Sequence, residues 1–325
     1  MIKKILLDIF NRVGNFFGAE IQSKSYINKF NKIFEQTFWH LYAAKRFPKL
    51  NDGFTCVIFS KDRALQLYAL LESMQMYTSF NYRIIILFKA SNVENKTSYH
   101  ELISESKIFS LNIKWVEEIG DFKNNLLSIL NQVNTNRIFF LTDDDIFIDK
   151  FNFASCKKFA CDKFIFSLRH SKNITKSYNE KKIINSPKFL KSLVNNKFLE
   201  FKWFEGSGEW SDPWSVNGHI YCLNEIKILS EILTYSGPNS YEASLKFLNF
   251  LVQNKIGVCS ERAKIINNPI NITQNEWINR SGNLTSADYL SAWQEGKKLN
   301  ILVLKGHNPR STHEVHKLPF INRIV

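Results

Sequence analysis

Three consecutive aspartates follow directly on an apolar run. Residues 137–142 read RIFFLT, and Asp143, Asp144 and Asp145 come next. Carboxylates packed this closely repel one another and raise one another's pKa, and a divalent cation relieves the repulsion. Oxygen ligands of this kind suit Mg²⁺ or Mn²⁺. Because residues two apart on an extended segment point the same way, Asp143 and Asp145 could face one ion or its bound phosphates. The alternative is an acidic turn that caps a helix beginning near Ile146.

A second charged motif, Ser60-Lys61-Asp62-Arg63, follows the apolar run at 54–59. A turn from a strand into a helix presents backbone N–H groups and the helix dipole to an anion. Its side chains are also available to a base, a ribose or a phosphate. The chain has neither GxGxxG nor GxxxxGK[ST], which disfavours a dinucleotide fingerprint and a P-loop. The alternative is that Ser60 or Asp62 simply caps the following helix.

The elements around these motifs alternate between short β-rich runs and helical patterns. Strands are predicted at 54–59, 83–88, 113–116 and 137–141, with helices at 64–74 and 122–130. This alternation predicts an α/β fold with a mostly parallel central sheet flanked by helices. In such sheets ligands bind beyond the carboxyl ends of the strands, which is where both charged motifs stand.

The pattern after residue 150 is more mixed. A strand is predicted at 164–168, surface helix and loop over 171–200, and helices at 225–233 and 241–253. No internal repeat and no linker rich in Pro, Gly and Ser interrupts the chain. We therefore expect one catalytic domain, residues 51–325, behind an N-terminal helical extension, residues 1–50. Within the domain we distinguish two halves, residues 51–150 and residues 151–325.

The composition is that of a globular protein with a basic surplus. The 325 residues are 44% hydrophobic and 22% charged, which excludes wholesale disorder. Five scattered cysteines without a CxxC pair favour neither a disulfide framework nor a cysteine-rich zinc site. The net charge is +13, and residues 1–50 contribute a surplus of six. Such a surplus suggests an anionic partner, namely phospholipid, nucleic acid or a phosphorylated substrate, or else reflects an AT-rich genome.

Residues 1–17 place apolar side chains at helical spacing and basic ones mostly elsewhere. This pattern predicts an amphipathic helix, which could lie in an anionic membrane interface or pack on the body or on a partner subunit. No apolar run is long enough to span a membrane, and no secretory signal is recognised. We expect a cytoplasmic protein that is peripheral on the inner face of the membrane.

Two of these segments together resemble a known family. The sequences SKDRALQL at 60–67 and TDDDIFI at 142–148, with Lys123 in the helix between them, resemble GT-A-fold glycosyltransferases. The resemblance runs from about Phe54 to the C-terminus. It implies that residues 51–150 are the nucleotide-sugar-binding half and residues 151–325 the acceptor-binding half. It implies a GT-A-like fold in which the carboxylates of a DxD motif hold a divalent metal on the diphosphate of a nucleotide-sugar.

The resemblance also assigns roles to single residues. It makes Asp145 the best direct metal ligand and places Asp143 near the ribose or the metal. Among the histidines at 306–316 it makes His313 the first choice as a third metal ligand, with His316 second. The implied donor-binding residues are Ser60, Asp62, Arg63, Lys123, Asp143 and Asp144.

The segment at 209–221, EWSDPWSVNGHIY, resembles the glycine-containing loop that lines the sugar and acceptor site. Indoles suit this role because sugar C–H faces stack on them, and acidic side chains hydrogen-bond hydroxyls. The implied contacts to the sugar and the acceptor are Glu209, Trp210, Asp212, Trp214, Asn217, Gly218 and His219.

A catalytic base is implied where the family has its xED motif. The family's aspartate is replaced by Ala243, so Glu242 must serve as the base in an inverting reaction. The alternative is that Glu242 only complements the dipole at the start of its helix. If Glu242 points away from the acceptor, a retaining mechanism is favoured.

These features predict a glycosyltransferase that uses Mn²⁺ or Mg²⁺ and moves a sugar from a nucleotide donor, most simply a UDP-sugar. Its acceptor would be a glycan or a lipid-linked glycan in bacterial lipopolysaccharide, capsule or surface-polysaccharide synthesis. One rival is a sugar-phosphate nucleotidyltransferase, but its glycine-rich activating loop is missing from the sequence. The other rival is a basic nucleic-acid-binding protein. No nucleic-acid partner is expected, because three aspartates repel phosphate without a metal.

Overall fold

The computed structural model describes residues 24–79, 82–178, 180–269 and 285–323, in two compact units, Met1–Pro48 and Lys49–Val325. In the first unit the described element is the helix α2 (Lys24–Ala44), on which Phe30 and Ile33 are exposed. The amphipathic helix predicted at 1–17 lies outside the described residues. No helix in the described ranges is both long and apolar enough to cross a bilayer.

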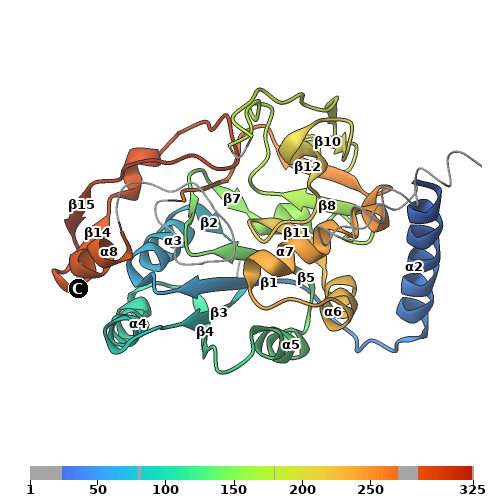
Figure 1. The fold of residues 1–325 in the computed structure, drawn as a ribbon. Coiled ribbons are helices and arrows are strands. Elements are labelled where there is room, and N and C mark those ends of the chain that lie inside the picture. The colour runs from blue at the N-terminus through green and yellow to red at the C-terminus, as the bar shows by residue number, and fades with distance from the viewer. Residues whose placement is uncertain (1–23, 80–81, 179, 270–284, 324–325) are drawn as a thin grey trace, which may run out of the picture. The chain divides into compact units, whose positions relative to one another are not determined.

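The second unit opens with alternating strands and helices (Figure 1). In chain order they are β1 (Asn51–Lys61), α3 (Ala64–Tyr77), β3 (Arg83–Lys89), α4 (Val93–Glu105), β4 (Asn112–Glu117), α5 (Phe122–Gln132) and β5 (Thr135–Thr142). All four strands and both helices predicted for this half are confirmed.

The helix α4 was not predicted. Its sequence, VENKTSYHELISE, buries only Ser98, Tyr99 and Leu102, so the apolar stripe is too narrow to stand out as a pattern. The sequence does contain one indication of this helix, the N-cap residue Asn92 at its start. The side chain of Asn92 accepts a hydrogen bond from the Asn95 amide at 2.8 Å.

The remaining elements are shorter. They are β2 (Thr78–Ser79), β6 (Asp145–Phe147), β7 (Phe151–Asn152), β8 (Phe164–Ser167), β9 (Leu190–Lys191), β10 (Phe198–Lys202), β11 (His219–Cys222), α6 (Leu223–Ile232), α7 (Pro238–Lys246), β12 (Ile256–Ser260), β13 (Ile265–Asn267), α8 (Ser286–Gln294), β14 (Lys297–Leu299) and β15 (Phe320–Asn322). Five single-turn 3₁₀ helices complete the described elements.

Two predictions for the second half need correction, and one alternative for the first half is ruled out. The described residues between 171 and 200 contain no helix, because this polar stretch forms turns, the edge strand β9 and the start of β10. The helix predicted at 241–253 is α7, which ends at Lys246, and a separate 3₁₀ turn covers Asn249–Val252. No helix begins near Ile146, since β6 occupies that position.

A nine-stranded sheet organises the domain, in the order β4-β3-β1-β5-β11-β8-β12-β10-β9. The first four strands are parallel to one another. The strand β11 runs antiparallel to β5 and β8, and β10 runs antiparallel to β12 and β9. Because β8 and β12 are parallel, only β11 and β10 oppose the common direction. The fold is therefore an α/β fold with a mostly parallel central sheet, as predicted.

Helices cover both faces of this sheet. On one face Cys56 and Ile58 of β1 join a core with the α3 residues Leu67 and Leu70. On the other face the ring of Phe59 packs 5.3 Å from the ring of Phe122 in α5. Burial on both faces explains why residues 54–59 form a continuous apolar run.

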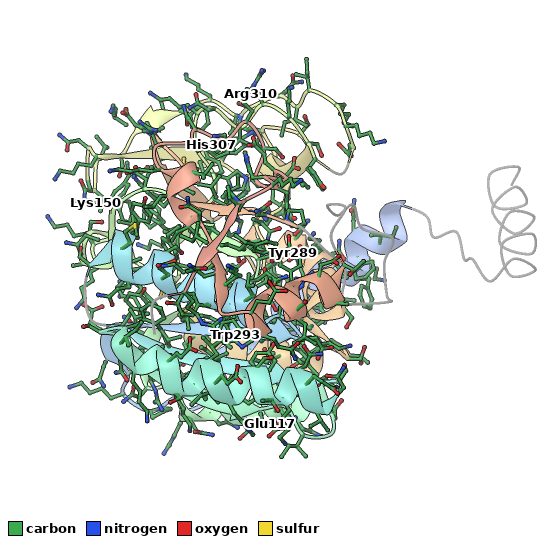
Figure 2. The ribbon with its side chains drawn as sticks, turned by 90° about the vertical axis from the view of Figure 1, so that its left-hand side faces the viewer. Glu117, Lys150, Tyr289, Trp293, His307 and Arg310 are labelled. Atoms are coloured by element: carbon green, nitrogen blue, oxygen red, sulfur yellow. The ribbon has the colours of Figure 1, made fainter. Side chains whose placement is uncertain are left out.

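The C-terminal region crosses the first of these faces. The helix α8 packs on α3 and α4, and the indole of Trp293 donates a hydrogen bond to Glu101 at 2.7 Å. From Tyr289 and Trp293 the chain continues to the end of the domain that carries His307 and Arg310 (Figure 2).

The strand order changes direction between β1 and β5. The chain moves outward from β1 to β3 and β4, then returns through α5 to the other side of β1 at β5. At such a switch point the connections leave the two neighbouring strands in opposite directions, which opens a crevice beyond their carboxyl ends. The two charged motifs of the sequence follow these two strands.

Candidate active site

The aspartates form the turn between β5 and β6, beyond the carboxyl end of β5. The amide of Asp143 donates to the Phe59 carbonyl at 3.1 Å, which continues the pairing of β1 and β5. The amide of Thr142 donates to Asp145 Oδ2 at 2.9 Å, and the Thr142 hydroxyl donates to Asp144 Oδ1 at 2.7 Å. Thr142 therefore fixes the turn from within.

Arg63 joins the two motifs. Its Nη1 lies 2.8 Å from Asp143 Oδ1 and 3.3 Å from Asp144 Oδ2. The Lys61 amide donates to the other oxygen of Asp143 at 3.1 Å. Although burial opposes it, the pairing with Asp143 and Asp144 raises the pKa of Arg63. Arg63 thus remains a cation beside the aspartates.

Asp145 is fully buried and is bound by amides. Asn217, just before β11, donates to its Oδ2 at 3.0 Å, and Asn267, at the end of β13, donates to its Oδ1 at 3.1 Å. Asn267 also donates to Asp144 at 2.8 Å. Sequence reasoning missed Asn267, whose one signal is a pair of asparagines directly after the apolar residues Ile265 and Ile266.

One guanidinium does not neutralise three carboxylates. Burial, followed by the charge of Asp144, raises the pKa of Asp145 to about 7. Burial also raises the pKa of Asp143 to about 6, with Asp144 adding to the rise and Arg63 opposing it. This uncompensated negative charge, and donors that are mostly carboxylate oxygens, fit a hard divalent cation such as Mg²⁺ or Mn²⁺.

The predicted nucleotide contacts Ser60 and Asp62 hold the turn after β1. The hydroxyls of Ser60 and Tyr99 lie 2.6 Å apart, in the core. Asp62 has a φ of 56° and accepts hydrogen bonds from the amide and the hydroxyl of Ser91, both at 2.7 Å. The N-cap of α3 is Arg63, so the alternative that Ser60 or Asp62 caps this helix is wrong.

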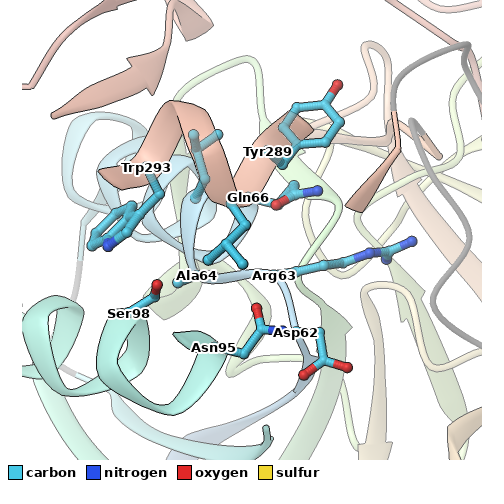
Figure 3. A pocket seen from close by; sticks show the side chains of 10 residues that line it. Asp62, Arg63, Ala64, Gln66, Asn95, Ser98, Tyr289 and Trp293 are labelled. Carbon is cyan, nitrogen blue, oxygen red and sulfur yellow. The ribbon is translucent and has the colours of Figure 1, made fainter. Parts of the chain in front are cut away.

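A small pocket opens beside this turn, between α3, α4 and α8 (Figure 3). It has room for about one water molecule. The side chains around it are mostly polar and include Asp62, Arg63, Gln66, Asn95 and Ser98.

Lys123 lies in a different environment from the one predicted. Its ammonium donates to the carbonyls of Glu231 and Leu233 at the end of α6. A cation there satisfies orphan carbonyls and interacts favourably with the helix dipole. The structure therefore does not bring Lys123 to the aspartates, and its assignment to the donor is corrected.

A second charged cluster consists of Arg169, Asp212, Glu242 and Lys246. The ammonium of Lys246 lies 2.7 Å from Glu242 Oε1 and 2.9 Å from Asp212 Oδ2. The buried guanidinium of Arg169 lies 3.9 Å from the same Asp212 oxygen. The other Asp212 oxygen, Oδ1, is buried and has no hydrogen-bond partner in the described part of the chain.

The two acids of this cluster differ in proton affinity. Burial, and then the charge of Glu242, raises the pKa of Asp212 to about 6. For Glu242 burial is outweighed by Lys246, by Arg169 and by the Val216 amide, which together lower its pKa. That amide donates to Glu242 Oε2 at 3.1 Å and so fixes the loop before β11.

Trp210 and Trp214 lie in the core, at 0% and 1% exposure. The indole of Trp210 donates to the Ile174 carbonyl at 3.0 Å, and its ring centroid is 5.1 Å from that of Phe201. The prediction that these indoles stack on a sugar is therefore corrected. Their setting among Gly, Ser and Pro reflects tight turns that bury them.

Glu209 and His219 are buried as well. Glu209 accepts a hydrogen bond from the Tyr178 amide at 3.3 Å. His219 Nδ1 lies 3.0 Å from the Pro213 carbonyl. Burial, followed by Arg169, lowers the pKa of His219 to about 3, so its ring is neutral. Neither side chain is open to an acceptor, and both predicted contacts are corrected.

Gly218 lets β11 start beside β5. Its φ is +75°, and a Cβ there would lie 2.2 Å from the Cδ1 of Ile265. Its amide donates to the Phe140 carbonyl at 2.8 Å, so the backbone cannot easily withdraw. Gly218 therefore has a backbone role, next to the Asn217 that binds Asp145.

We expect Gly218→Ala to lower the free energy of unfolding by about 2–4 kcal/mol, from left-handed backbone strain and a steric clash. Gly120→Ala is the matched control, because Gly120 has a φ of +72° and open space around it. The control should lose only about 1 kcal/mol. Urea unfolding measures both, and equal losses would contradict the packing argument.

His313 lies between the two charged clusters. Its backbone pairs with that of Asn267 in an isolated parallel β-bridge. The Glu314 amide donates a hydrogen bond to the Asn267 carbonyl at 3.1 Å. Burial first, then Arg169, lowers the pKa of His313 to about 4, while the charges of Glu242 and Asp144 act in the opposite direction. The ring is thus neutral, the form that ligates metals. His316 instead contacts Glu314 and His307.

Comparison with known proteins gives only distant likenesses. No family model matches the chain, and no curated protein matches it. Among solved structures it is similar to S. aureus TarS residues 1–349 in complex with UDP-GlcNAc, at a TM-score of 0.43 and 14% identity, covering 70% of this chain and 60% of that one. A mannosyltransferase from Pyrobaculum calidifontis in complex with GDP-Man and Mn²⁺ has a TM-score of 0.30 and 9% identity, with 47% and 50% covered.

A third similar structure is not a glycosyltransferase. It is the 4-diphosphocytidyl-2C-methyl-D-erythritol synthase of Anaerococcus prevotii, at a TM-score of 0.38 and 11% identity, covering 69% of this chain and 92% of that one. Because every TM-score lies below 0.5, the proposals below rest on this chain's own residues.

Proposed function

We propose that this protein is a metal-dependent glycosyltransferase that moves a sugar from a nucleotide-diphosphate donor to a hydroxyl. The observation that carries the proposal is the buried excess of carboxylate charge at the switch point of the sheet. Asp143, Asp144 and Asp145 meet there with Arg63, on the crevice where α/β folds bind ligands. A cation and a diphosphate together would balance that charge.

We propose Asp144, Asp145 and His313 as the metal ligands; their ligand atoms do not all lie within 4.8 Å of one another, so they would have to draw closer around the ion. Asp144 is the aspartate that reaches furthest toward solvent, with 13% of its side chain exposed against 4% for Asp143. Asp143 is engaged by Arg63, so we assign it to positioning that cation for the donor's phosphates. When bound, the metal would neutralise charge that grows on the leaving nucleoside diphosphate.

Asp212 is the better candidate for the general base. A base works best when its pKa lies near the working pH, and the pKa of Asp212 is raised to about 6. Both oxygens of Glu242 are engaged, by Lys246 and by the Val216 amide, and its pKa is lowered. We therefore propose that Glu242 orients Lys246 and that Asp212 takes the proton of the acceptor hydroxyl.

The acceptor and its location follow from the rest of the sequence. We propose a glycan or lipid-linked glycan of a bacterial surface polysaccharide as the acceptor. The basic surplus of residues 1–50 supports recruitment to an anionic membrane surface, on the inner face where nucleotide-sugars are made.

A panel of nucleotide-sugars tests the proposal. We expect one donor to raise the melting temperature by about 5 °C or more at saturation with Mn²⁺, and to do so much less after chelation. Slow release of the nucleoside diphosphate should accompany that shift. Pyrophosphate release from a nucleoside triphosphate and a sugar phosphate would instead establish the nucleotidyltransferase rival. Stabilisation by no nucleotide or nucleotide-sugar, with or without metal, would contradict both enzymes.

A further inference from the structure

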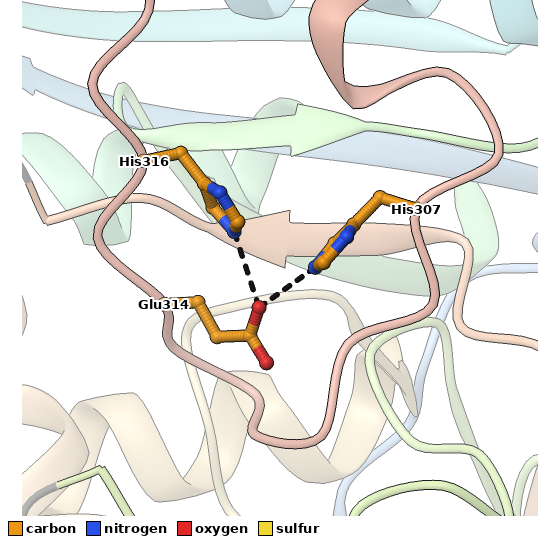
Figure 4. A group of neighbouring side chains, drawn as sticks. All are labelled: His307, Glu314 and His316. Atoms are coloured by element: carbon orange, nitrogen blue, oxygen red, sulfur yellow. Dashed lines mark hydrogen bonds and ion pairs between the residues drawn. The ribbon is translucent and has the colours of Figure 1, made fainter.

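Three metal-ligating side chains that the proposed transfer does not use converge within residues 307–316. Each of the three, His307, Glu314 and His316, directs an atom that can bind a metal, an imidazole nitrogen or a carboxylate oxygen, to one place (Figure 4). His307 Nε2 lies 2.7 Å from Glu314 Oε2, and His316 Nε2 lies 3.1 Å from the same oxygen. Among the described residues this is the one set of three such groups whose donor atoms all lie within 4.8 Å of one another.

The carboxylate of this group is positioned by the backbone. Glu314 Oε1 accepts hydrogen bonds from the amides of Arg310 and Ser311, at 2.7 and 3.1 Å. Its Oε2 is thereby left to the two imidazoles.

The group is also anchored to the aspartate turn. The side chain of Asn268 accepts from the His316 amide at 2.8 Å and donates to the His316 carbonyl at 3.1 Å. Asn268 is fully buried, and its own amide donates to the Asp144 carbonyl at 2.8 Å. A rigid connection therefore runs from the aspartates to this group.

We propose that His307, Glu314 and His316 form a second metal site, of the zinc class and distinct from the aspartate site. Two imidazole nitrogens and one carboxylate oxygen are a donor set typical of Zn²⁺, whereas the aspartates suit Mg²⁺ or Mn²⁺. A tetrahedral zinc ion keeps its ligand atoms about 3.4 Å apart, so His307 would move away from the Glu314 oxygen by about 0.7 Å and His316 by about 0.3 Å. A water molecule would take the fourth position.

The consequence of such an ion is structural. It would close the loop from His307 to His316, which carries His313, and hold that histidine beside Asn267 at the aspartate turn. Zinc would then support the active site from outside without taking part in the transfer. The inference stands on the three donors alone and does not depend on the identity of the reaction.

Zinc binding to the full chain tests the site. Chelator-treated protein is titrated with Zn²⁺ against a chromogenic chelator, and with Co²⁺ to detect the visible absorption of tetrahedral coordination. We expect one tight Zn²⁺ per chain and binding that is about 100-fold weaker in the double variant His307→Ala/His316→Ala. Asp145→Asn, in the other site, should keep the tight ion. His100→Ala is the histidine control, because His100 is an exposed residue of α4.

The wild-type titration decides the matter even if the double variant fails to fold. No tight Zn²⁺ on the chelator-treated wild type would overturn the proposal, and so would equal affinity in the wild type and a folded double variant. Glu314→Gln gives a gentler check, because it keeps the side-chain size and removes the charge; it should weaken zinc binding while circular dichroism stays unchanged. Retention of activity after zinc removal would leave the metal site standing, since its readout is binding.

Discussion

Asp145→Asn is expected to lower sugar transfer about 1,000-fold and, at the same time, to raise the melting temperature of the metal-free protein at pH 8. The loss of transfer corresponds to several kcal/mol of transition-state charge stabilisation that the metal supplies. The gain in stability follows because Asp145 is fully buried and its charged form is held only by neutral donors, the amides and the Thr142 hydroxyl, with the charge of Asp144 nearby. A neutral isostere removes that unfavourable charge.

The pH dependence of stability has a definite sign. The pKa of Asp145 is about 7 in the folded chain, against an ordinary 3.8. Between these values the folded chain binds a proton that the unfolded chain releases, so the free energy of unfolding falls as pH rises from about 4 to about 7. Asp143, with a pKa of about 6, acts in the same direction. Urea unfolding of the metal-free protein at pH 5 and pH 8 should show this fall, and a smaller one in Asp145→Asn.

Metal should reverse the order of the melting temperatures of the wild type and Asp145→Asn. Saturating Mn²⁺ binds only the folded wild type and stabilises it by mass action, whereas the variant gains little. Asp149→Asn is the matched control, because Asp149 stands on the same segment but pairs with Lys264, at 2.6 Å. It should leave transfer and the metal response unchanged. A variant Asp145→Asn that keeps wild-type transfer would contradict the metal assignment, and one that melts lower at pH 8 would contradict the charge argument.

The part of the site that could be predicted from the sequence lies within single chain segments. A strand that ends in three aspartates, next to another that ends in a charged turn, is local information. The parallel order then requires the two ends to meet, as Arg63 and Asp143 do. Asn217, predicted as a sugar or acceptor contact, donates a hydrogen bond to Asp145 instead, and the role of His313 as a metal ligand stays a prediction.

The remaining partners lie far apart along the chain and carry no pattern of their own. Asn267 reaches Asp145 across 122 residues, and Arg169 faces Asp212 from another element. For the tryptophans the error was to include residues rather than to miss them. The sequence alone does not distinguish a tryptophan that lines a sugar site from one that fills a core. Trp210 and Trp214 fill the core. Residue type and local setting therefore predicted that the aspartates at 143–145 lie beside Arg63, but did not separate the buried Trp210, Trp214 and Glu209 from side chains that could reach a sugar.

Asp212→Asn is expected to lower the rate of transfer about 100- to 10,000-fold while leaving donor binding intact, the range attributed to a positioned general base. Donor binding is followed by thermal shift, and transfer by product formation with a saturating acceptor. In the wild type, transfer should fall as pH drops through about 6, because Asp212 becomes protonated there. This fall in rate at low pH, the acid limb of the pH–rate profile, should be missing from the residual activity of Asp212→Asn.

Glu242→Gln tests whether Asp212 or Glu242 is the general base. Glu242 pairs with Lys246 and holds the Val216 amide, and glutamine keeps an acceptor for that amide. We expect a loss of about 10-fold, with the acid limb shifted to lower pH because a negative charge that raises the pKa of Asp212 has been removed. If Glu242→Gln instead causes the larger loss and abolishes the acid limb, Glu242 is the base and Asp212 its partner. If neither variant loses more than about 10-fold, no side chain of this cluster takes the acceptor proton, and a retaining mechanism becomes the better explanation.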